Sequence, residues 1–289
     1  MKGIILSGGS GSRLYPTTIA FSKQLLPVYN KPMIYYSLSA LMLAQLKEIL
    51  IITTKEDLCR YKKLLGTGKD LGMKISYAIQ TKPRGLADSF LVGKKFIGKD
   101  DVCLILGDNI FYGNGFAELL NKSKNIVDKN KNAVILTYKV NNPSEYGIAN
   151  IHNGKLISLE EKPKRPKSNN AIVGLYFYPN SVIKFAKKVK TSKRGELEIT
   201  DLNKIYLELK KIEVVQMSRG FAWFDAGTIE SLNETSQFIK SIENRMGQKI
   251  GCIEEIALHN EWISKKQIKV LAKKYSNTEY GKYLINLSS

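Results

Sequence analysis

The hydrophobic and polar positions of the chain alternate between two patterns. Short apolar runs flanked by glycine or charged residues are typical of strands buried on both faces of a parallel sheet, whereas longer mixed stretches are typical of helices. In the first half of the chain, strands are expected at residues 2–6, 49–52, 74–80 and 102–106, and helices at 32–46, 56–65 and 86–96. This alternation predicts an α/β fold with a Rossmann-like, mixed but mostly parallel sheet covered by helices on both faces.

The order of elements changes in the second half. After a helix at 116–127, shorter strands are expected at 133–140, 148–151, 155–159, 172–178 and 214–217. Asn153-Gly154 is a hairpin turn signal between two of them, and Thr228 is suited to cap a helix. The remaining expected elements are a helix opened by residues 195–201 and ending near 211, a tight turn at 223–228, a long amphipathic helix at 229–246, and helical segments at 253–257 and 262–274. We therefore expect a core unit at 1–227 and a helical extension at 228–289.

Exposed apolar residues of the extension, such as Trp262 and Ile263, need a covering surface. Packing on the core of the same chain is the favoured interpretation, and a subunit interface is the alternative.

Composition narrows the class of protein. No segment approaches the roughly 20 apolar residues of a membrane span, and the N-terminus enters its first strand without a signal sequence, so a cytoplasmic protein without a membrane partner is expected. Cys59, Cys103 and Cys252 lie far apart without C-x-x-C spacing, so we interpret them as ordinary buried thiols rather than as a disulfide or zinc site.

The net charge of +19 raises the question of nucleic-acid binding. The lysines are scattered in pairs, and no basic block is interleaved with aromatic residues. The pattern therefore argues against a nucleic-acid partner, although a basic field attracts nucleotides and sugar phosphates.

A glycine-rich loop, residues 7–12, follows the first expected strand. Glycine lets backbone N–H groups approach phosphate oxygens, and Arg13 and Lys23 add positive charge. The loop is not a Walker A motif, because no lysine follows the glycines, and Leu14 stands where a dinucleotide fingerprint needs its third glycine. A polyphosphate site is predicted here, with a plain flexible turn as the alternative.

Two aspartates are candidates for metal binding. Asp108 follows the strand at 102–106, and ligands of open α/β sheets bind beyond the carboxyl ends of strands. A carboxylate beside a polyphosphate needs an intervening cation, and Mg²⁺ accepts carboxylate and phosphate oxygens together. A turn-forming role is the alternative for Asp108. Asp225 follows Trp223-Phe224, where an unpaired, partly buried carboxylate would be costly, so a cation is expected beside it.

Motifs along the whole chain resemble the sugar nucleotidyltransferase family, in the family's order. They are LSGGSGSRL, SKQLLP, PMIYYSL, LGDNIFYG, EYGI, LEEKP, GLYFY, RGELEITDLN and FDAGT. RGELEITD and LGDNIFYG are similar to the thymidylyl branch, the glucose-1-phosphate thymidylyltransferases. The resemblance implies a Mg²⁺-dependent reaction in which dTTP and α-D-glucose 1-phosphate give dTDP-glucose and pyrophosphate, the first step towards dTDP-deoxysugars such as dTDP-L-rhamnose for polysaccharide. Residues 1–227 would then be the catalytic core.

The implied reaction agrees with the small number of side chains in this sequence that could act as a general base or a nucleophile. The sugar phosphate oxygen that attacks the α-phosphorus is already ionised near neutral pH, so no general base is needed. The only histidines, His152 and His259, belong to no Ser-His-Asp or Cys-His arrangement and are interpreted as surface or polar-packing residues. Catalysis would depend on positioning and charge neutralisation.

The resemblance assigns roles to particular residues. Arg13 and Lys23 would contact phosphates, and Asp108 and Asp225 would hold Mg²⁺. The nucleotide would be bound by Gly8, Gly9, Ser10, Gly11, Ser12, Gln24, Gln80, Gly85 and Leu86. The sugar phosphate would be bound by Asn109, Tyr146, Gly147, Glu161, Lys162 and Val173.

The resemblance also implies a homotetramer and feedback inhibition by a dTDP-deoxysugar near the C-terminal helices. The residues implied in that regulatory site are Gly115, Arg219, Gly220, Cys252, Glu255, Ile256 and His259.

Two other functions stay open. One is a pyrophosphorylase for UTP or another sugar 1-phosphate, because Arg84 stands where the family more often has an acidic residue and Asp88 where it commonly has Gln. The other is a non-catalytic regulatory paralogue that binds sugar nucleotide. The joint presence of Arg13, Lys23, Asp108 and Asp225 argues against the second, because binding alone does not need this full set of charges.

Overall fold

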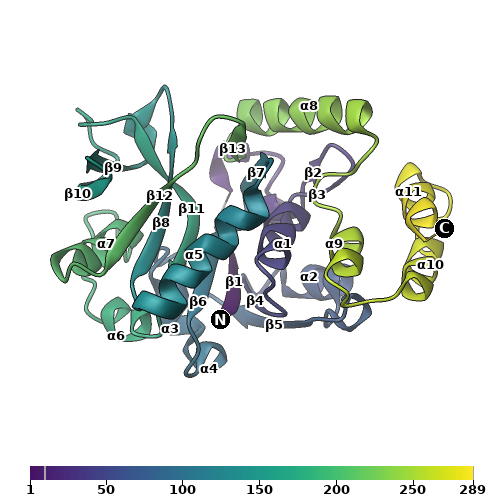
Figure 1. Cartoon of the computed structure of the whole chain (residues 1–289), viewed down its shortest axis with the longest axis horizontal. Coiled ribbons are helices and arrows are strands. Elements are labelled where there is room, and N and C mark those ends of the chain that lie inside the picture. The colour runs from purple at the N-terminus through teal and green to yellow at the C-terminus, as the bar shows by residue number, and fades with distance from the viewer. Residues whose placement is uncertain (10, 289) are drawn as a thin grey trace.

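A mixed β-sheet runs through the middle of the molecule in the computed structural model, which describes residues 1–9 and 11–288 (Figure 1). Its first half is parallel: β1 (Lys2–Ser7) lies between β4 (Glu48–Thr53) and β6 (Val102–Leu106), and β5 (Lys74–Ile79) pairs with β4. These are the four strands expected from the apolar runs. The predicted α/β class is confirmed.

The second half of the sheet is mostly antiparallel and continues from β6. Its strands are β8 (Ala133–Lys139), β9 (Gly147–His152), β10 (Lys155–Glu161), β11 (Asn170–Tyr178) and β12 (Ile212–Gln216). The sheet order is β10-β9-β11-β6-β1-β4-β5, with β8 beside β11 and β12 beside β8. Asn153 and Gly154, with φ of 48° and 74°, form the predicted turn between β9 and β10.

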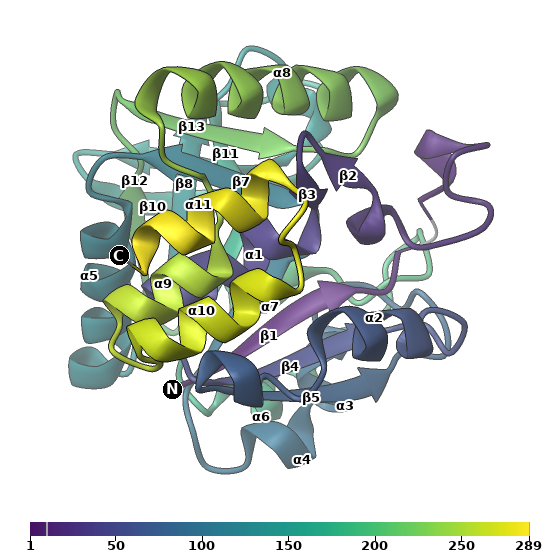
Figure 2. The same cartoon turned by 90° about the vertical axis from the view of Figure 1, so that its right-hand side faces the viewer.

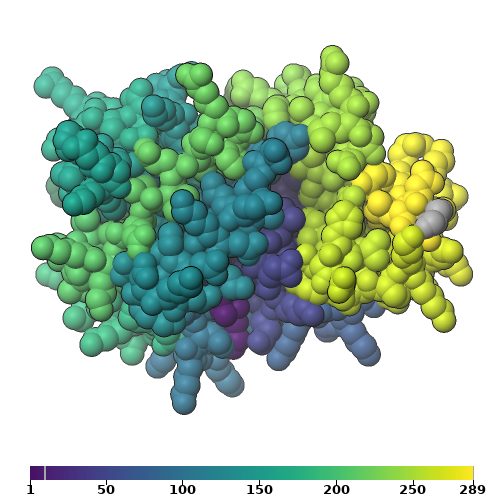
Figure 3. Space-filling model, viewed as in Figure 1, coloured from purple at the N-terminus to yellow at the C-terminus, as the bar shows by residue number. Residues whose placement is uncertain are grey.

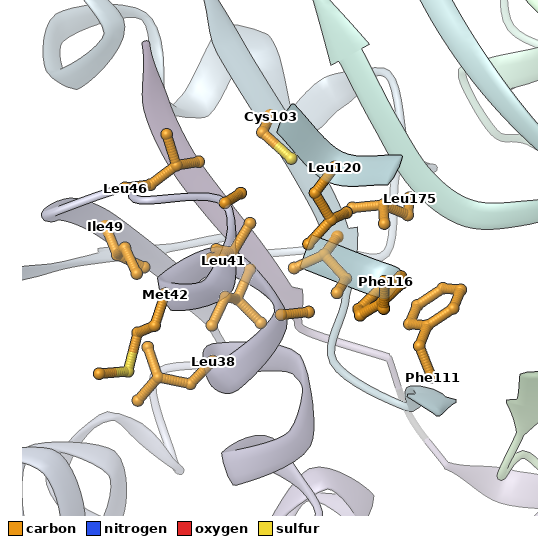
Figure 4. Packing of buried hydrophobic residues seen from close by; sticks show 14 of the residues in the cluster. Leu38, Leu41, Met42, Leu46, Ile49, Cys103, Phe111, Phe116, Leu120 and Leu175 are labelled. Atoms are coloured by element: carbon orange, nitrogen blue, oxygen red, sulfur yellow. The ribbon is translucent and has the colours of Figure 1, made fainter. Parts of the chain in front are cut away.

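Helices cover both faces because successive side chains of each strand point to opposite sides. Ile5 of β1 belongs to the cluster with α1 (Ile34–Leu43), α2 (Leu58–Leu65) and α5 (Phe116–Asn130). Figure 4 shows Leu38 and Leu41 of α1 and Phe116 and Leu120 of α5 among the side chains of this cluster. Ile4 belongs to the opposite cluster, whose helices are α3 (Asp88–Val92), α4 (Lys94–Ile97), α6 (Val182–Ala186) and α7 (Ile199–Glu208).

The chain after residue 228 forms helices only, within the part that the structure describes. They are α8 (Ile229–Met246), α9 (Ile253–His259), α10 (Lys265–Lys273) and α11 (Glu279–Leu287). Thr228 caps α8 in a capping box with Ser231, as predicted. α9, α10 and α11 lie together at one end of the molecule (Figures 2 and 3).

This extension packs on the core of its own chain. Ile253, Ala257 and Leu271 join the hydrophobic cluster of α1 and β1, and Trp262 and Ile263 pack against it. The favoured interpretation of Trp262 and Ile263 is therefore confirmed, whereas the unit boundary at 227/228 stays a prediction.

The tight turn predicted at 223–228 is wrong. Residues Phe221–Asp225 form strand β13, which pairs antiparallel with the unexpected strand β7 (Asn109–Gly113). The apolar residues Phe221, Trp223 and Phe224 find their partner strand far away in sequence, which a local pattern does not reveal.

Several expected helices have different bounds, and three of these differences have a clear structural cause. The helix at 86–96 is divided into α3 and α4 at Gly93, where a Cβ would stand 3.0 Å from Ile4 Cδ1. α1 begins at Ile34, because Lys31–Pro32 pair with Pro27–Val28 as the short strands β3 and β2. α7 begins only at Ile199, because Leu197 N donates to Arg84 O at 2.7 Å in an extended segment.

The thiols are only partly as expected. Cys103 and Cys252 are buried, but Cys59 is exposed, because it lies on the outward side of α2. Within the described residues, no helix combines the length and the apolar character that a membrane crossing requires.

Candidate active site

The glycine loop leaves the carboxyl end of β1 beside the carboxyl end of β6, because Leu6 pairs with Leu106. Gly8 and Gly9 line a cavity of about 170 Å³, called the first cavity here. Gly11 has a φ of 63° and its carbonyl accepts a hydrogen bond from Thr18 Oγ1 at 2.7 Å, which closes the loop on itself. The predicted nucleotide residue Ser10 lies outside the described residues. The first cavity is also lined by Leu6, Lys23, Gln24, Gln80, Pro83, Gly85, Leu86, Leu106, Asp108 and Glu196.

Lys23 and Asp108 form a buried ion pair in the first cavity. Lys23 begins a 3₁₀ turn, Lys23–Leu25, and its Nζ donates to Asp108 Oδ2. Asn109 Nδ2 donates to the other carboxylate oxygen at 3.2 Å. Burial by itself would raise the pKa of Asp108, but the charge and hydrogen bond of Lys23, followed by that of Asn109, place the pKa below its ordinary value. Asp108 is therefore a carboxylate at neutral pH.

Asp225 reaches the same place from the second half of the chain. It is the last residue of β13 and pairs with Asn109, and Ala226 N donates to Asp108 O at 3.1 Å. Burial and the negative charge of Asp108 raise the pKa of Asp225 to about 6, against the lowering effect of Lys23, Arg13 and Lys162. Two carboxylates thus lie together among positive side chains.

Arg13 packs beside Asp225. A Cβ on Gly227 would stand 2.7 Å from Arg13 Nη2 and 3.0 Å from Asp225 Oδ1. Only glycine at 227 therefore lets the guanidinium and the carboxylate keep these positions around the backbone after β13.

A second cavity, of about 230 Å³, adjoins the first. The two share Leu86, Leu106 and Glu196 in their linings. Asp108 lines the first cavity and Asp225 the second. Of the residues predicted to bind sugar phosphate, the second cavity is lined by Asn109, Tyr146, Gly147, Glu161 and Lys162.

The polar groups of the second cavity are held in place by hydrogen bonds. Asn109 Oδ1 accepts from Trp223 Nε1 at 2.7 Å and from Gly174 N at 3.0 Å. Glu161 accepts from Thr200 Oγ1 at 2.5 Å and from Arg194 Nη2 at 3.0 Å. Fixed amide and carboxylate groups beside the aromatic Tyr146 and Trp223 are suited to the hydroxyls and ring faces of a sugar.

Val173 is placed differently from the other predicted sugar-phosphate residues. Its side chain is 0% exposed and belongs to the hydrophobic core. Its neighbours Ile172 and Gly174 line the second cavity, since side chains alternate along β11.

Arg194 and Glu196 line the cavities but were not among the residues predicted from the sequence. Arg194 bridges Glu161 and Glu198, and Glu196 touches both cavities. Both belong to the RGELEITDLN motif, which was the available signal.

The predicted regulatory residues come from several elements, and some of these meet, since Gly113 and Phe116 line one cavity with Ile256 and a Cβ on Gly113 would stand 2.9 Å from Gly220 O. Ile256 lines a cavity of about 180 Å³ between α1, the end of α8 and the start of α9. Cys252 is buried at the start of α9, Glu255 and His259 lie on α9, and Gly115 precedes α5. Arg219 and Gly220 lie between β12 and β13. His152 and His259 are exposed, as expected.

The fold and the two joined cavities define a nucleotide-binding transferase of the α/β type. Residues 2–242 match the family model described as nucleotidyl transferase, and the chain belongs to that family. It is a nucleotidyltransferase.

Relatives of the same length support this assignment. The chain is 51% identical to the glucose-1-phosphate thymidylyltransferase of Neisseria meningitidis serogroup A / serotype 4A over 288 residues, covering 99% of both chains. It is 48% identical to that of Mycobacterium tuberculosis, again covering 99% of both. The crystal structure of a protein assigned as a glucose-1-phosphate thymidylyltransferase from Bacillus anthracis, in complex with a sucrose, superposes with a TM-score of 0.76 at 41% identity, covering 82% of this chain and 94% of that one. A UDP-glucose pyrophosphorylase structure, at 23% identity and a TM-score of 0.73, shares the fold.

Proposed function

We propose that this chain transfers a thymidylyl group from dTTP to α-D-glucose 1-phosphate, giving dTDP-glucose and pyrophosphate. The observation that carries the proposal is that two cavities adjoin, with Lys23 and Asp108 in the lining of one and Lys162 and Asp225 in that of the other. The names of the full-length relatives support the substrate pair.

In the proposed reaction the first cavity holds the nucleotide and the second holds the sugar phosphate. A phosphate oxygen of the sugar attacks the α-phosphorus, the bond from that phosphorus to the oxygen bridging to the β-phosphorus breaks, and pyrophosphate leaves. Both reactants are anions, so their approach needs positive charge. We assign this role to Arg13, Lys23 and Lys162, whose positive charges each lower the pKa of Asp225.

The nucleophile is a phosphate oxygen that is already ionised, so the residues need only orient it. The buried Lys23 and Asn109, each held by Asp108, are suited to that task because their side chains are fixed before substrate binds.

The pair Asp108 and Asp225 fits a Mg²⁺ ion shared with phosphate oxygens. Mg²⁺ is usually held by one or two carboxylates together with substrate phosphates, rather than by a cage made of protein alone. When bound, the ion would neutralise phosphate charge.

We further infer self-association to a homotetramer, a cytoplasmic location, a role of the product in dTDP-deoxysugar synthesis, and feedback inhibition involving residues around Ile256. The 180 Å³ cavity that Ile256 lines supports the last of these.

A pyrophosphate-release assay tests the proposed function. The purified chain is supplied with dTTP or UTP and with glucose 1-phosphate or other hexose 1-phosphates. Release that is fastest with dTTP and glucose 1-phosphate is expected. Equal or faster release with another pair would overturn the proposed substrates, and binding without any release would indicate a regulatory paralogue.

A further inference from the structure

A buried carboxylate controls the orientation of an amide that lines the first cavity. Asp88, the first residue of α3, is 4% exposed, and Gln80, which follows β5, is 6% exposed. Gln80 Nε2 donates to Asp88 Oδ2 at 2.9 Å. The other oxygen of Asp88 lies 3.9 Å from Nε of Arg84, which belongs to the turn between β5 and α3.

The chemistry of this pair permits one orientation of the Gln80 amide. A carboxylate only accepts hydrogen bonds, whereas a primary amide has a donating NH₂ end and an accepting carbonyl end. The NH₂ end must therefore face Asp88. The carbonyl end faces the glycine loop, because Gln80 Oε1 lies 3.2 Å from where a Cβ on Gly8 would stand.

Gly8 and Gln80 line the first cavity together with uncharged residues, Pro83, Gly85 and Leu86. Lys23, Asp108 and Glu196 bring the charges of that cavity, and Glu196 lies on the Gly85 side. If the charged part receives phosphates, the uncharged part around Gln80 is suited to a base, which is flat and has hydrogen-bonding edges.

We propose that Asp88 is a positioning residue that makes the first cavity select pyrimidines with an N3–H donor, such as thymine or uracil, over cytosine. The inference rests on the proposed function, and it names the residue that sets base selectivity. The Gln80 carbonyl accepts the N3–H of thymine or uracil. N3 of cytosine is itself an acceptor, so two acceptors would face each other without a proton between them.

The substitution Asp88→Asn tests this proposal. The amide that it introduces at position 88 can turn its own NH₂ group towards Gln80, which lets the Gln80 amide rotate and present NH₂ to the cavity. The matched substrates are dUTP and dCTP, which share sugar, triphosphate and an unmethylated ring and differ at the pyrimidine edge. The kcat/KM ratio of dUTP to dCTP is expected to fall about tenfold or more in Asp88→Asn, the effect of one hydrogen bond made or lost.

A structural role for Asp88 would give a different result. A loosened fold lowers kcat/KM for both nucleotides alike, whereas a rotated amide changes their ratio. The exposed carboxylate Asp70, which pairs with Lys274, supplies the control Asp70→Asn, whose ratio is expected to match the unsubstituted chain. A ratio in Asp88→Asn equal to that of the unsubstituted chain overturns the proposal.

The double variant Gln80→Glu with Asp88→Asn again places a hydrogen-bond acceptor at the cavity, with the donor and acceptor of the pair exchanged. The new amide at position 88 donates to one oxygen of the new carboxylate at position 80, and the other carboxylate oxygen is an acceptor facing the cavity. The dUTP to dCTP ratio of this variant is expected to return towards the original value; a ratio as low as that of Asp88→Asn alone overturns the proposal. Should Asp88→Asn fail to fold, the double variant carries the test, with loss of the dUTP preference as the contradicting result.

The role of Asp88 and the proposed thymidylyl transfer can be tested independently of each other. If the unsubstituted chain makes no nucleotide sugar from dTTP, the proposed function is overturned. Calorimetric titration of dUTP and dCTP into the same preparations then tests Asp88 by affinity ratio alone.

Discussion

Asp225 stands opposite Asn109, the residue that follows Asp108, in the antiparallel pairing of β13 with β7. The hydrogen bond from Ala226 N to Asp108 O, 3.1 Å long, fixes this arrangement through the backbone. Two carboxylates from distant parts of the chain are therefore held together without help from a ligand. A shared cation is the simplest way to stabilise them, and phosphates are its natural further ligands.

We expect Asp108→Asn and Asp225→Asn each to lower kcat by at least about 100-fold, because each removes negative charge that would hold Mg²⁺ between the two phosphates. Turnover measured across a Mg²⁺ titration checks this, with circular dichroism to show that the fold is intact. Rates unchanged in both variants at every Mg²⁺ concentration would contradict the assignment of the two carboxylates.

The stability of the free protein should depend on pH through Asp225. Burial and Asp108 raise its pKa from 3.8 to about 6, so the folded chain binds this proton more tightly than the unfolded chain. The contribution is favourable below the unfolded pKa and is lost as the pH rises through about 6. Asp225→Asn should therefore stabilise the Mg²⁺-free protein at about pH 8 by about 1 to 3 kcal/mol, since one pKa unit corresponds to 1.36 kcal/mol.

Urea unfolding near pH 4 and near pH 8 measures this effect. The gain for Asp225→Asn should be present only at the higher pH, and the exposed Asp70→Asn should show none. A variant less stable than the unsubstituted chain at the higher pH would contradict the pKa shift.

Asn109 joins the two carboxylates to the second cavity. Asn109→Ala leaves two donors, Trp223 Nε1 and Gly174 N, without their acceptor. We expect the free energy of unfolding to fall by about 2 kcal/mol. We also expect the substitution to raise the KM for glucose 1-phosphate more than the KM for dTTP. Trp223→Phe removes one of these donors and should cost less in unfolding. Equal KM changes for both substrates would contradict a place for Asn109 on the sugar side.

The buried ion pair of Lys31 and Glu243 joins α8 to the core. Lys31 is 4% exposed, its Nζ donates to Glu243 Oε1 at 2.7 Å, and burial lowers its pKa despite the opposing charge of Glu243. Lys31→Met should cost about 3 kcal/mol in unfolding free energy, because Glu243 loses its closest cation while staying buried. The exposed pair Lys274 and Asp70 is the control: Lys274→Met should cost less than about 1 kcal/mol. Equal losses of unfolding free energy in the two variants would show that burial does not determine how much these ion pairs stabilise the fold.

The sequence predicted those features of the fold that depend on residues close together in the chain. The parallel strands, the hairpin at Asn153-Gly154 and the Thr228 cap rest on neighbouring residues, and all were predicted. The pairing of β7 with β13 joins residues far apart in sequence, so the segment around Trp223 was mistaken for a turn.

For the candidate site, the sequence predicted which residues take part better than it predicted where their side chains lie. Motifs identified Lys23, Asp108 and Lys162, which the structure places in the linings of adjoining cavities. Whether a side chain faces a cavity or the core depends on strand register, which motifs do not contain, and this is why Val173 was placed with the sugar pocket although its side chain is in the core. Arg194 was overlooked because its partner Glu161 lies on β10, which only folding brings to it.

The most direct measurement is the detection of products when the purified chain is mixed with dTTP, α-D-glucose 1-phosphate and Mg²⁺. We expect dTDP-glucose and pyrophosphate in equal amounts, and neither product with Lys23→Met, which removes the cation paired with Asp108. A folded, Mg²⁺-supplied chain that forms no dTDP-glucose, or a Lys23→Met variant as active as the original, would contradict it.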